Sequence, residues 1–262
     1  MADQVCNNCG ASLLGPFCHQ CGQREIDEWR TIGAIVRQFW EELVNLDYKA
    51  ARTVAALLRP GYLAAEFIAG RRGRHLGPLK VYFLAAALFF FIAPRATDFT
   101  FERQMALDWD GEFRAQVEAR IAETHISREL FAERFGSTAQ TVYTIAPMLS
   151  VLTVTFLLRL LYRRRFPWLG PHSVFALYYI AFMYLVALFI HGVNNVFEPP
   201  NGYILIAIQY GIVVPFMFVA LRRVYGEPPG LTFGKTLTLL VLAFAIDMPV
   251  AIAATRLSIT LT

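Results

Sequence analysis

Four cysteines near the N-terminus are the residues whose types and spacing best suit chemistry. They form two Cys-X-X-Cys-Gly knuckles separated by eight residues. Two thiolates at this spacing can grip one metal ion, and the glycine after each pair permits the left-handed turn that such a knuckle uses. Four thiolates in a tetrahedron suit Zn²⁺. We therefore predict a zinc ribbon over residues 1–24, with one structural zinc bound by Cys6, Cys9, Cys18 and Cys21.

The same four cysteines allow two other interpretations. Iron in a rubredoxin-like site would have the same ligands. A dithiol redox pair usually opens a helix in a thioredoxin-like unit, and no such unit surrounds these residues. His19 lies inside the second knuckle, but four sulfurs complete a structural site, so we interpret it as an exposed bystander. Gly15-Pro16 predicts the turn of a short β-hairpin that brings the two pairs together.

The charge of the ribbon indicates which class of partner it can bind. A nucleic-acid site needs a basic face, and Arg24 is the only arginine or lysine of the ribbon. We therefore expect no nucleic acid and favour docking of a protein partner. Residues 1–4 lack the basic and apolar stretches of an export signal, so we expect the ribbon to stay in the reducing cytosol.

Composition predicts that the rest of the chain lies in a membrane. The chain is 56% hydrophobic and 17% charged, against roughly 25% charged in soluble domains. A helix needs about 20 apolar residues to cross a bilayer core of about 30 Å. We predict an all-α integral membrane protein with about five transmembrane helices, at residues 79–93, 142–162, 173–193, 203–221 and 236–255. The first block is short, so it must draw on residues 76–78, with Lys80 reaching the headgroups, or cross a thinned bilayer.

Charge in the connectors predicts the orientation of these spans. Residues 95–141 carry six arginines against nine acidic groups, and residues 194–202 carry no basic residue. The other connectors are basic, so basic and non-basic connectors alternate as the positive-inside rule requires. We expect a cytosolic N-terminus, an extracytoplasmic C-terminus and a helical outer loop at 95–141. The basic residues expected at the inner leaflet are Arg71, Arg72, Arg74, Arg163, Arg164 and Arg165.

Residues 25–75 have the pattern of cytosolic amphipathic helices. An apolar stripe runs from Ile32 to Val44, with adjacent glutamates on its polar face. A helix on a lipid surface would be basic there, so we expect packing on the protein's own membrane domain, with partner docking as the alternative. A second amphipathic stretch covers residues 52–68 and is broken at Pro60-Gly61.

Several runs in this region resemble a known family. They are Phe17 to Gln23, Arg52 to Gly61, Gly70-Arg71-Arg72 and Gly77 to Phe83. Together they are similar to an uncharacterised bacterial family, a domain of unknown function, that joins a zinc ribbon to several spans. The resemblance covers about the first 95 residues, with Gly77 a minor departure. It implies a bacterial inner-membrane protein and transfers no activity, substrate or catalytic residue.

One ionisable residue lies deep in a predicted span. Counting about 1.5 Å per residue puts Asp247 in the outer half of the membrane, and Gln209 and Ser150 reach a similar depth. A charged group in lipid is costly, so these three are a candidate polar site. For Gln209 and Ser150 we favour a single hydrogen bond between helices, whereas for Asp247 both interpretations stand.

The sequence contains no catalytic constellation, so we expect a protein that is not an enzyme. One hypothesis is a membrane adaptor or regulator whose ribbon docks a cytosolic partner. The alternative is a small transporter or channel that uses the polar layer around Asp247.

Overall fold

The described part of the chain is helical. The computed structural model describes residues 5–23, 49–92, 101, 104–105, 108, 111–197 and 202–262. Within these ranges an isolated antiparallel bridge joins Val5 and Ser12, and Phe17 also makes a bridge-type pairing. The helices are α2 (Lys49–Leu57), α3 (Tyr62–Ile68), α4 (Pro78–Ile92), α6 (Glu112–Thr124), α7 (Arg128–Tyr162), α8 (Leu169–Phe197), α9 (Gly202–Tyr225) and α10 (Pro229–Leu261). The all-α prediction for the membrane region is confirmed.

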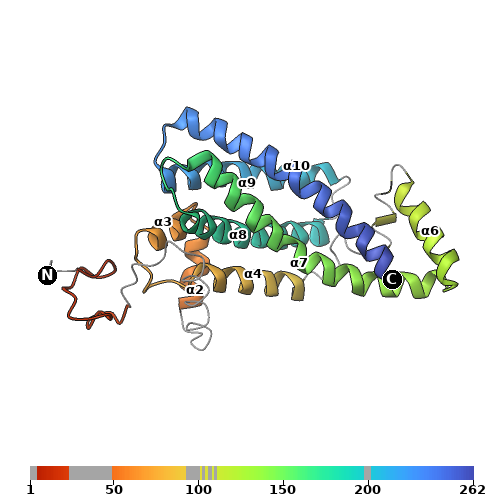
Figure 1. Ribbon diagram of the computed structural model, residues 1–262, viewed down its shortest axis with the longest axis horizontal. Helices are drawn as coiled ribbons and strands as arrows, with labels where there is room; N and C mark the ends of the chain where they lie inside the picture. The colour runs from red at the N-terminus through yellow and green to blue at the C-terminus, as the bar shows by residue number, and fades with distance from the viewer. Residues whose placement is uncertain are drawn as a thin grey trace.

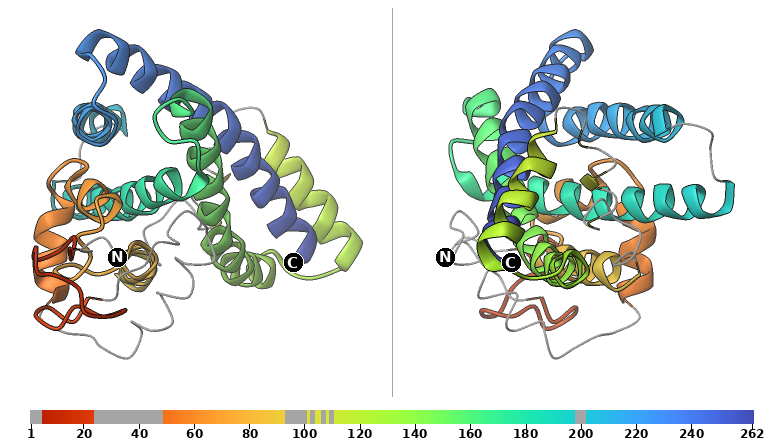
Figure 2. Two further views of the ribbon diagram at one scale, coloured as in Figure 1. Left: turned by 60° about the vertical axis from the view of Figure 1, so that its left-hand side comes forward. Right: turned by 90° about the vertical axis from the view of Figure 1, so that its right-hand side faces the viewer.

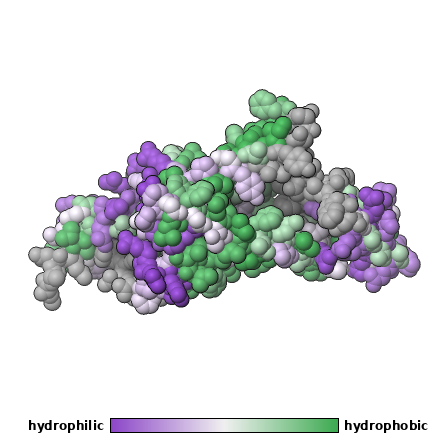
Figure 3. All heavy atoms as spheres, turned by 90° about the horizontal axis from the view of Figure 1, so that it is seen from above, coloured by the Kyte–Doolittle hydropathy of each residue, from purple (hydrophilic) through white to green (hydrophobic). Residues whose placement is uncertain are grey.

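Helix α8 lies at the centre of the bundle (Figures 1 and 2). Helices α4, α7 and α9 pack on it, and α10 packs chiefly on α7. The apolar window of α8 is 61% buried, whereas that of α10 is only 11% buried. The apolar side chains of α10 therefore face outward, as lipid-facing side chains do. Figure 3 shows a hydrophobic middle between polar ends on the face that it draws.

Three helical stretches are long and apolar enough to cross a membrane. They are Leu169–Asn194, Ala207–Tyr225 and Pro229–Leu261, and they correspond to the last three predicted spans. The first two predicted spans appear as shorter apolar stretches, Pro78–Ile92 and Met148–Tyr162. Both pack along α8. Lys80 is only 5% exposed, so its side chain packs into the protein, unlike in the alternative that has it reaching the headgroups.

Helices α7 and α10 extend beyond the bundle at the end opposite α2 and α3. Helix α7 has 35 residues and α10 has 33, which at about 1.5 Å per residue exceeds a bilayer core of about 30 Å. Their projecting ends hold α6 through a separate small core in which Phe131, Phe135 and Ile259 are buried. Within the segment predicted to be a helical loop at 95–141, residues 112–124 form α6 and residues 128–141 form the start of α7. Helix α7 continues without a break into the apolar stretch, because residues 141–142 include no proline or glycine that would end it.

Helices α2 and α3 close the other end, which we call the ribbon end. The predicted break at Pro60-Gly61 is present. Gly61 has φ 67°, and a Cβ there would lie 2.7 Å from the carbonyl oxygen of Ala220. This position therefore needs glycine for both its backbone conformation and its contact with α9.

The basic connectors gather at the ribbon end. Arg223, at the end of α9, donates to the carbonyl oxygen of Pro60 at 2.6 Å. Lys235, in the first turns of α10, donates to the carbonyl oxygen of Leu161 at 2.9 Å. The predicted stripe at residues 32–44 lies outside the described residues.

Candidate metal centre

Two turns of the same geometry position the four cysteines. In the first, the N–H of Cys6 donates to Ala11 and the N–H of Gly10 donates to Cys6. In the second, Cys18 and Gly22 repeat both bonds, at 2.8 Å each. Gly10 and Gly22 have φ 78° and 69°, the left-handed turn that the sequence predicts.

The expected hairpin is not present as a ladder among residues 5–23. Apart from the Val5–Ser12 bridge, the hydrogen bonds of the cysteine segments close the knuckles upon themselves. The two halves of the ribbon meet at the four sulfur atoms.

The four sulfurs form one compact group. Their ligand atoms all lie within 4.8 Å of one another, and Cys6 and Cys18 are buried. The Cys6–Cys21 and Cys9–Cys18 sulfur pairs are 3.6 and 3.5 Å apart, too far for disulfides, which need about 2.05 Å. Tetrahedral zinc with bonds of about 2.3 Å holds its sulfurs about 3.8 Å apart. These residues can therefore hold a metal ion of that size, and His19 is exposed outside the group.

The thiols ionise unequally. A hydrogen bond from the Asn8 side chain lowers the pKa of Cys21 to about 6. At Cys9, the hydrogen bond with the backbone of Ala11 also favours the thiolate. Desolvation and the neighbouring thiols outweigh it and raise the pKa of Cys9 to about 12. Because negative charges so close together repel one another, a bound divalent cation favours ionisation of the whole set.

The ribbon is fixed to the loop between α3 and α4. The Gln23 side chain donates to the carbonyl oxygen of Gly70 at 2.7 Å. Its own oxygen accepts from the N–H groups of Arg72 and Gly73, both at 3.0 Å. The Asn7 side chain lies against Gly70 so closely that a Cβ there would meet it at 3.1 Å. The knuckle side of the ribbon therefore lies on this loop.

The predicted inner-leaflet arginines divide into two groups, both at the ribbon end. Arg71 makes a bidentate pair with Glu66, at 2.8 and 2.6 Å. This hydrogen bond lowers the pKa of Glu66. Arg72 lies over the ring of Phe67 at 4.8 Å, and Arg74 is exposed. The second group, at the end of α7, is exposed and consists of Arg163, Arg164 and Arg165.

Two of the three residues of the candidate intramembrane site lie together in the structure. The Ser150 side chain hydrogen-bonds the carboxyl group of Asp247. Tyr179 lies within electrostatic reach of Asp247 and of Tyr210. Among the described residues, Gln209 makes no hydrogen bond to Ser150 or Asp247. The polar layer therefore joins α7, α8 and α10, with a tyrosine of α9 nearby.

One family comparison matches part of the chain. Residues 47–90 match the family model described as Protein of unknown function (DUF3667). No curated protein and no solved structure matches the chain. The DUF3667 segment begins just before α2 and ends within α4. It therefore contains the loop that receives the ribbon.

Two features of the site carry no clear sequence signal. Gln23 binds backbone groups of the DUF3667 segment. Backbone groups are shared by nearly all residue types, so the sequence of that segment does not indicate this contact. The second is a polar contact inside the bundle. His172 is fully buried and hydrogen-bonds the Tyr225 hydroxyl at 2.9 Å and the Phe166 carbonyl at 3.1 Å. The sequence shows His172 only as a residue near the start of a span.

Proposed function

We propose that this chain is a non-enzymatic adaptor or regulator of the bacterial inner membrane, whose N-terminal zinc ribbon docks a cytosolic protein partner. The proposal includes five spans with the N-terminus in the cytosol and the C-terminus outside. The gathering of basic connectors at the ribbon end supports this orientation, since basic residues favour the cytosolic side. The resemblance of the first 95 residues supports the bacterial setting.

The attachment of the ribbon carries the proposal. Gln23 fixes one side of the ribbon to the loop at residues 70–73, within hydrogen-bonding distance of three backbone groups. Three large apolar side chains on the same small module are more than half exposed, namely Val5, Leu14 and Phe17. Leu14 is 86% exposed. Exposed apolar side chains of this size can serve as contacts for a protein partner.

The test is affinity purification of the intact protein from gently solubilised membranes. A form lacking residues 1–23 and a Leu14→Ser variant are compared with it. We expect a specific partner to co-purify with the intact protein, to be lost with the truncation and to be depleted by Leu14→Ser. Gln20→Ser, an exposed polar change in the second knuckle, is the matched control. The adaptor proposal fails if the same proteins are recovered with and without the ribbon.

The alternative is a small transporter or channel. The contact between Ser150 and Asp247 supports it, because a carboxyl group inside a span is costly unless it has partners or a function. A hydrogen bond that merely joins α7 to α10 would have the same geometry. We therefore keep the adaptor as the proposal.

A further inference from the structure

A cluster of cationic side chains lies beside the ribbon attachment, where α2, the α2–α3 turn and the loop before α4 meet. Arg52 lies on α2, Arg59 in the turn, and Arg74 and His75 in the loop. The Arg59 guanidinium carbon lies 5.8 Å from the centre of the Tyr62 ring. The His75 ring meets the same tyrosine edge-on at 5.8 Å. The Tyr62 ring therefore lies against both Arg59 and His75.

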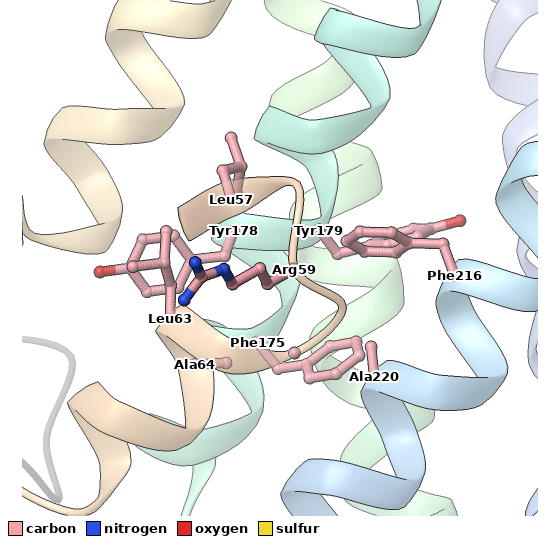
Figure 4. A pocket seen from close by; sticks show the side chains of 10 residues that line it. Leu57, Arg59, Leu63, Ala64, Phe175, Tyr178, Tyr179, Phe216 and Ala220 are labelled. Atoms are coloured by element: carbon pink, nitrogen blue, oxygen red, sulfur yellow. The ribbon is translucent and has the colours of Figure 1, made fainter. Parts of the chain in front are cut away.

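The cluster has a rigid support. Thr53, next to Arg52, accepts a hydrogen bond from the N–H of Leu76 at 3.0 Å. The Tyr178 hydroxyl of α8 donates to the carbonyl oxygen of Leu76 at 2.8 Å. Arg59 lines a small cavity with Tyr178 and Gly61 (Figure 4). The loop carrying Arg74 and His75 is therefore held between α2 and the core helix α8.

Among the described residues, the acid that faces His75 in this cluster is already paired. Glu66 is the acidic group that acts on His75, and Arg71 already binds both of its oxygens. Burial lowers the pKa of His75, and the charges of Arg52, Arg74 and Arg59 lower it further against the opposing effect of Glu66. Among the described residues, no carboxylate pairs with Arg59 or Arg74. Like charges so close together are unfavourable unless an anion joins them.

The histidine also offers an unused hydrogen-bonding atom. The Nδ1 atom of His75 is buried and has no hydrogen-bond partner among the described residues. A buried polar atom without a partner costs about 1–3 kcal/mol. A ligand oxygen at this position would satisfy the atom and lie within the field of the arginines.

We propose that Arg59, Arg74 and His75, with Arg52 at the edge, form a binding site for a phosphate group at the ribbon end of the bundle. Arginine guanidinium groups bind phosphate oxygens in pairs, and the His75 Nδ1 supplies one further contact. The phosphate belongs either to an anionic phospholipid or to a soluble phosphorylated compound. This site does not depend on the proposed partner of the ribbon.

The first arm of the test uses lipid. The full-length protein is purified in neutral detergent, offered phosphatidylglycerol or phosphatidylcholine, and examined by native mass spectrometry for retained lipid. We expect preferential retention of phosphatidylglycerol. The loss should be about fivefold for Arg59→Gln or Arg74→Gln alone and about 25-fold for the double variant, since a basic residue near an anionic surface contributes about 1 kcal/mol. Arg163→Gln with Arg164→Gln, two exposed arginines at the same end, should change retention less than twofold.

The second arm uses inorganic pyrophosphate and no lipid, with the thermal midpoint of the same proteins as the readout. Stabilisation by pyrophosphate without discrimination between lipids assigns the site to a soluble compound, whereas lipid selectivity alone assigns it to a headgroup. If Arg59→Gln fails to fold, Arg74→Gln and Arg59→Lys keep the test valid. Arg59→Lys retains the charge but not the paired contact. Equal losses in the Arg163/Arg164 control, or no response of the wild-type protein in either arm, would overturn the proposal.

Discussion

The side-chain amide of Gln23 donates to the carbonyl oxygen of Gly70 at 2.7 Å, across 47 residues of sequence. With the two bonds that its oxygen accepts, Gln23 makes three hydrogen bonds between the ribbon and the DUF3667 segment. A net hydrogen bond stabilises a protein by about 1 kcal/mol. Gln23→Ala should therefore increase opening of the ribbon at least about tenfold while leaving its metal bound. Hydrogen exchange at the N–H groups of Arg72 and Gly73 measures this.

The matched control is Gln20→Ala, because Gln20 is an exposed glutamine on the same ribbon. Its exchange should equal that of the wild-type protein. Unchanged protection of residues 72 and 73 in Gln23→Ala would mean that the ribbon is held by other contacts.

The second prediction concerns the metal. The purified protein should contain one zinc per chain, and Cys18→Ser should lose it, because Cys18 is a buried member of the sulfur group. About twenty residues cannot build a core, so the ribbon should unfold with loss of the metal. The helices satisfy their own backbone bonds, so membrane insertion should persist.

Elemental analysis and membrane fractionation measure these two outcomes. His19→Ser is the control, because His19 is exposed and outside the sulfur group. It should retain zinc. A wild-type protein kept reduced throughout and still free of metal would contradict the prediction, and iron in its place would favour the rubredoxin-like alternative.

The third prediction concerns the contact of the α2–α3 turn with α9. In Gly61→Ala, the new Cβ would lie 2.7 Å from the carbonyl oxygen of Ala220, and φ 67° is itself unfavourable for alanine. We expect a loss of about 2 kcal/mol in stability, from the left-handed conformation and the clash together. Thermal unfolding in detergent measures it. Gly136→Ala in α7 should be neutral or stabilising, because its Cβ would meet nothing within 4 Å.

Local chemistry and composition predict a good part of this fold. The cysteine spacing predicts the knuckles, and the glycine after each one predicts its left-handed turn. Pro60-Gly61 predicts the break between α2 and α3. Apolar length predicts the last three spans. Counting a constant rise per residue predicts that Ser150 and Asp247 lie at one depth in the membrane, and the two residues are in contact.

Other features depend on information that is not local. The boundary expected at residues 141–142 rests on a change of composition. A helix ends where its backbone hydrogen bonds end, whatever the composition. Gly136 does not interrupt the backbone hydrogen bonds of α7. Asp247 and Gln209 reach similar depths, but depth alone does not fix which way a side chain points around its helix. The expected hairpin is not shown among residues 5–23, where each knuckle forms hydrogen bonds within its own backbone.

The fourth prediction concerns topology. Single cysteines in place of Ala115, Glu198, Trp168 and Pro228 should divide into two classes. The first two should react with an impermeant thiol reagent in intact spheroplasts, and the last two only after lysis. The reason is the alternation of basic and non-basic connectors. A protected Ala115→Cys would mean that the Pro78–Ile92 helix does not cross the membrane, and five spans would then be wrong.

The last prediction separates the two functional proposals and uses Asp247. Asp247→Asn keeps the size of the side chain and an oxygen that can accept the hydrogen bond of Ser150, but it removes the group that can carry a charge. If the protein is an adaptor, this variant should complement a deletion strain as well as the wild-type protein does, while deletion of residues 1–23 should not.

The reverse pattern identifies a transporter or channel. Asp247→Asn at normal abundance would then fail to complement, and the protein without its ribbon would still work. Ser150→Ala serves as the second variant, because it removes the hydrogen bond and leaves the carboxyl group in place. A role limited to joining helices predicts that Ser150→Ala is at least as damaging as Asp247→Asn. A titrating carboxyl group predicts that Asp247→Asn is far worse, because only that change removes the charge from the membrane.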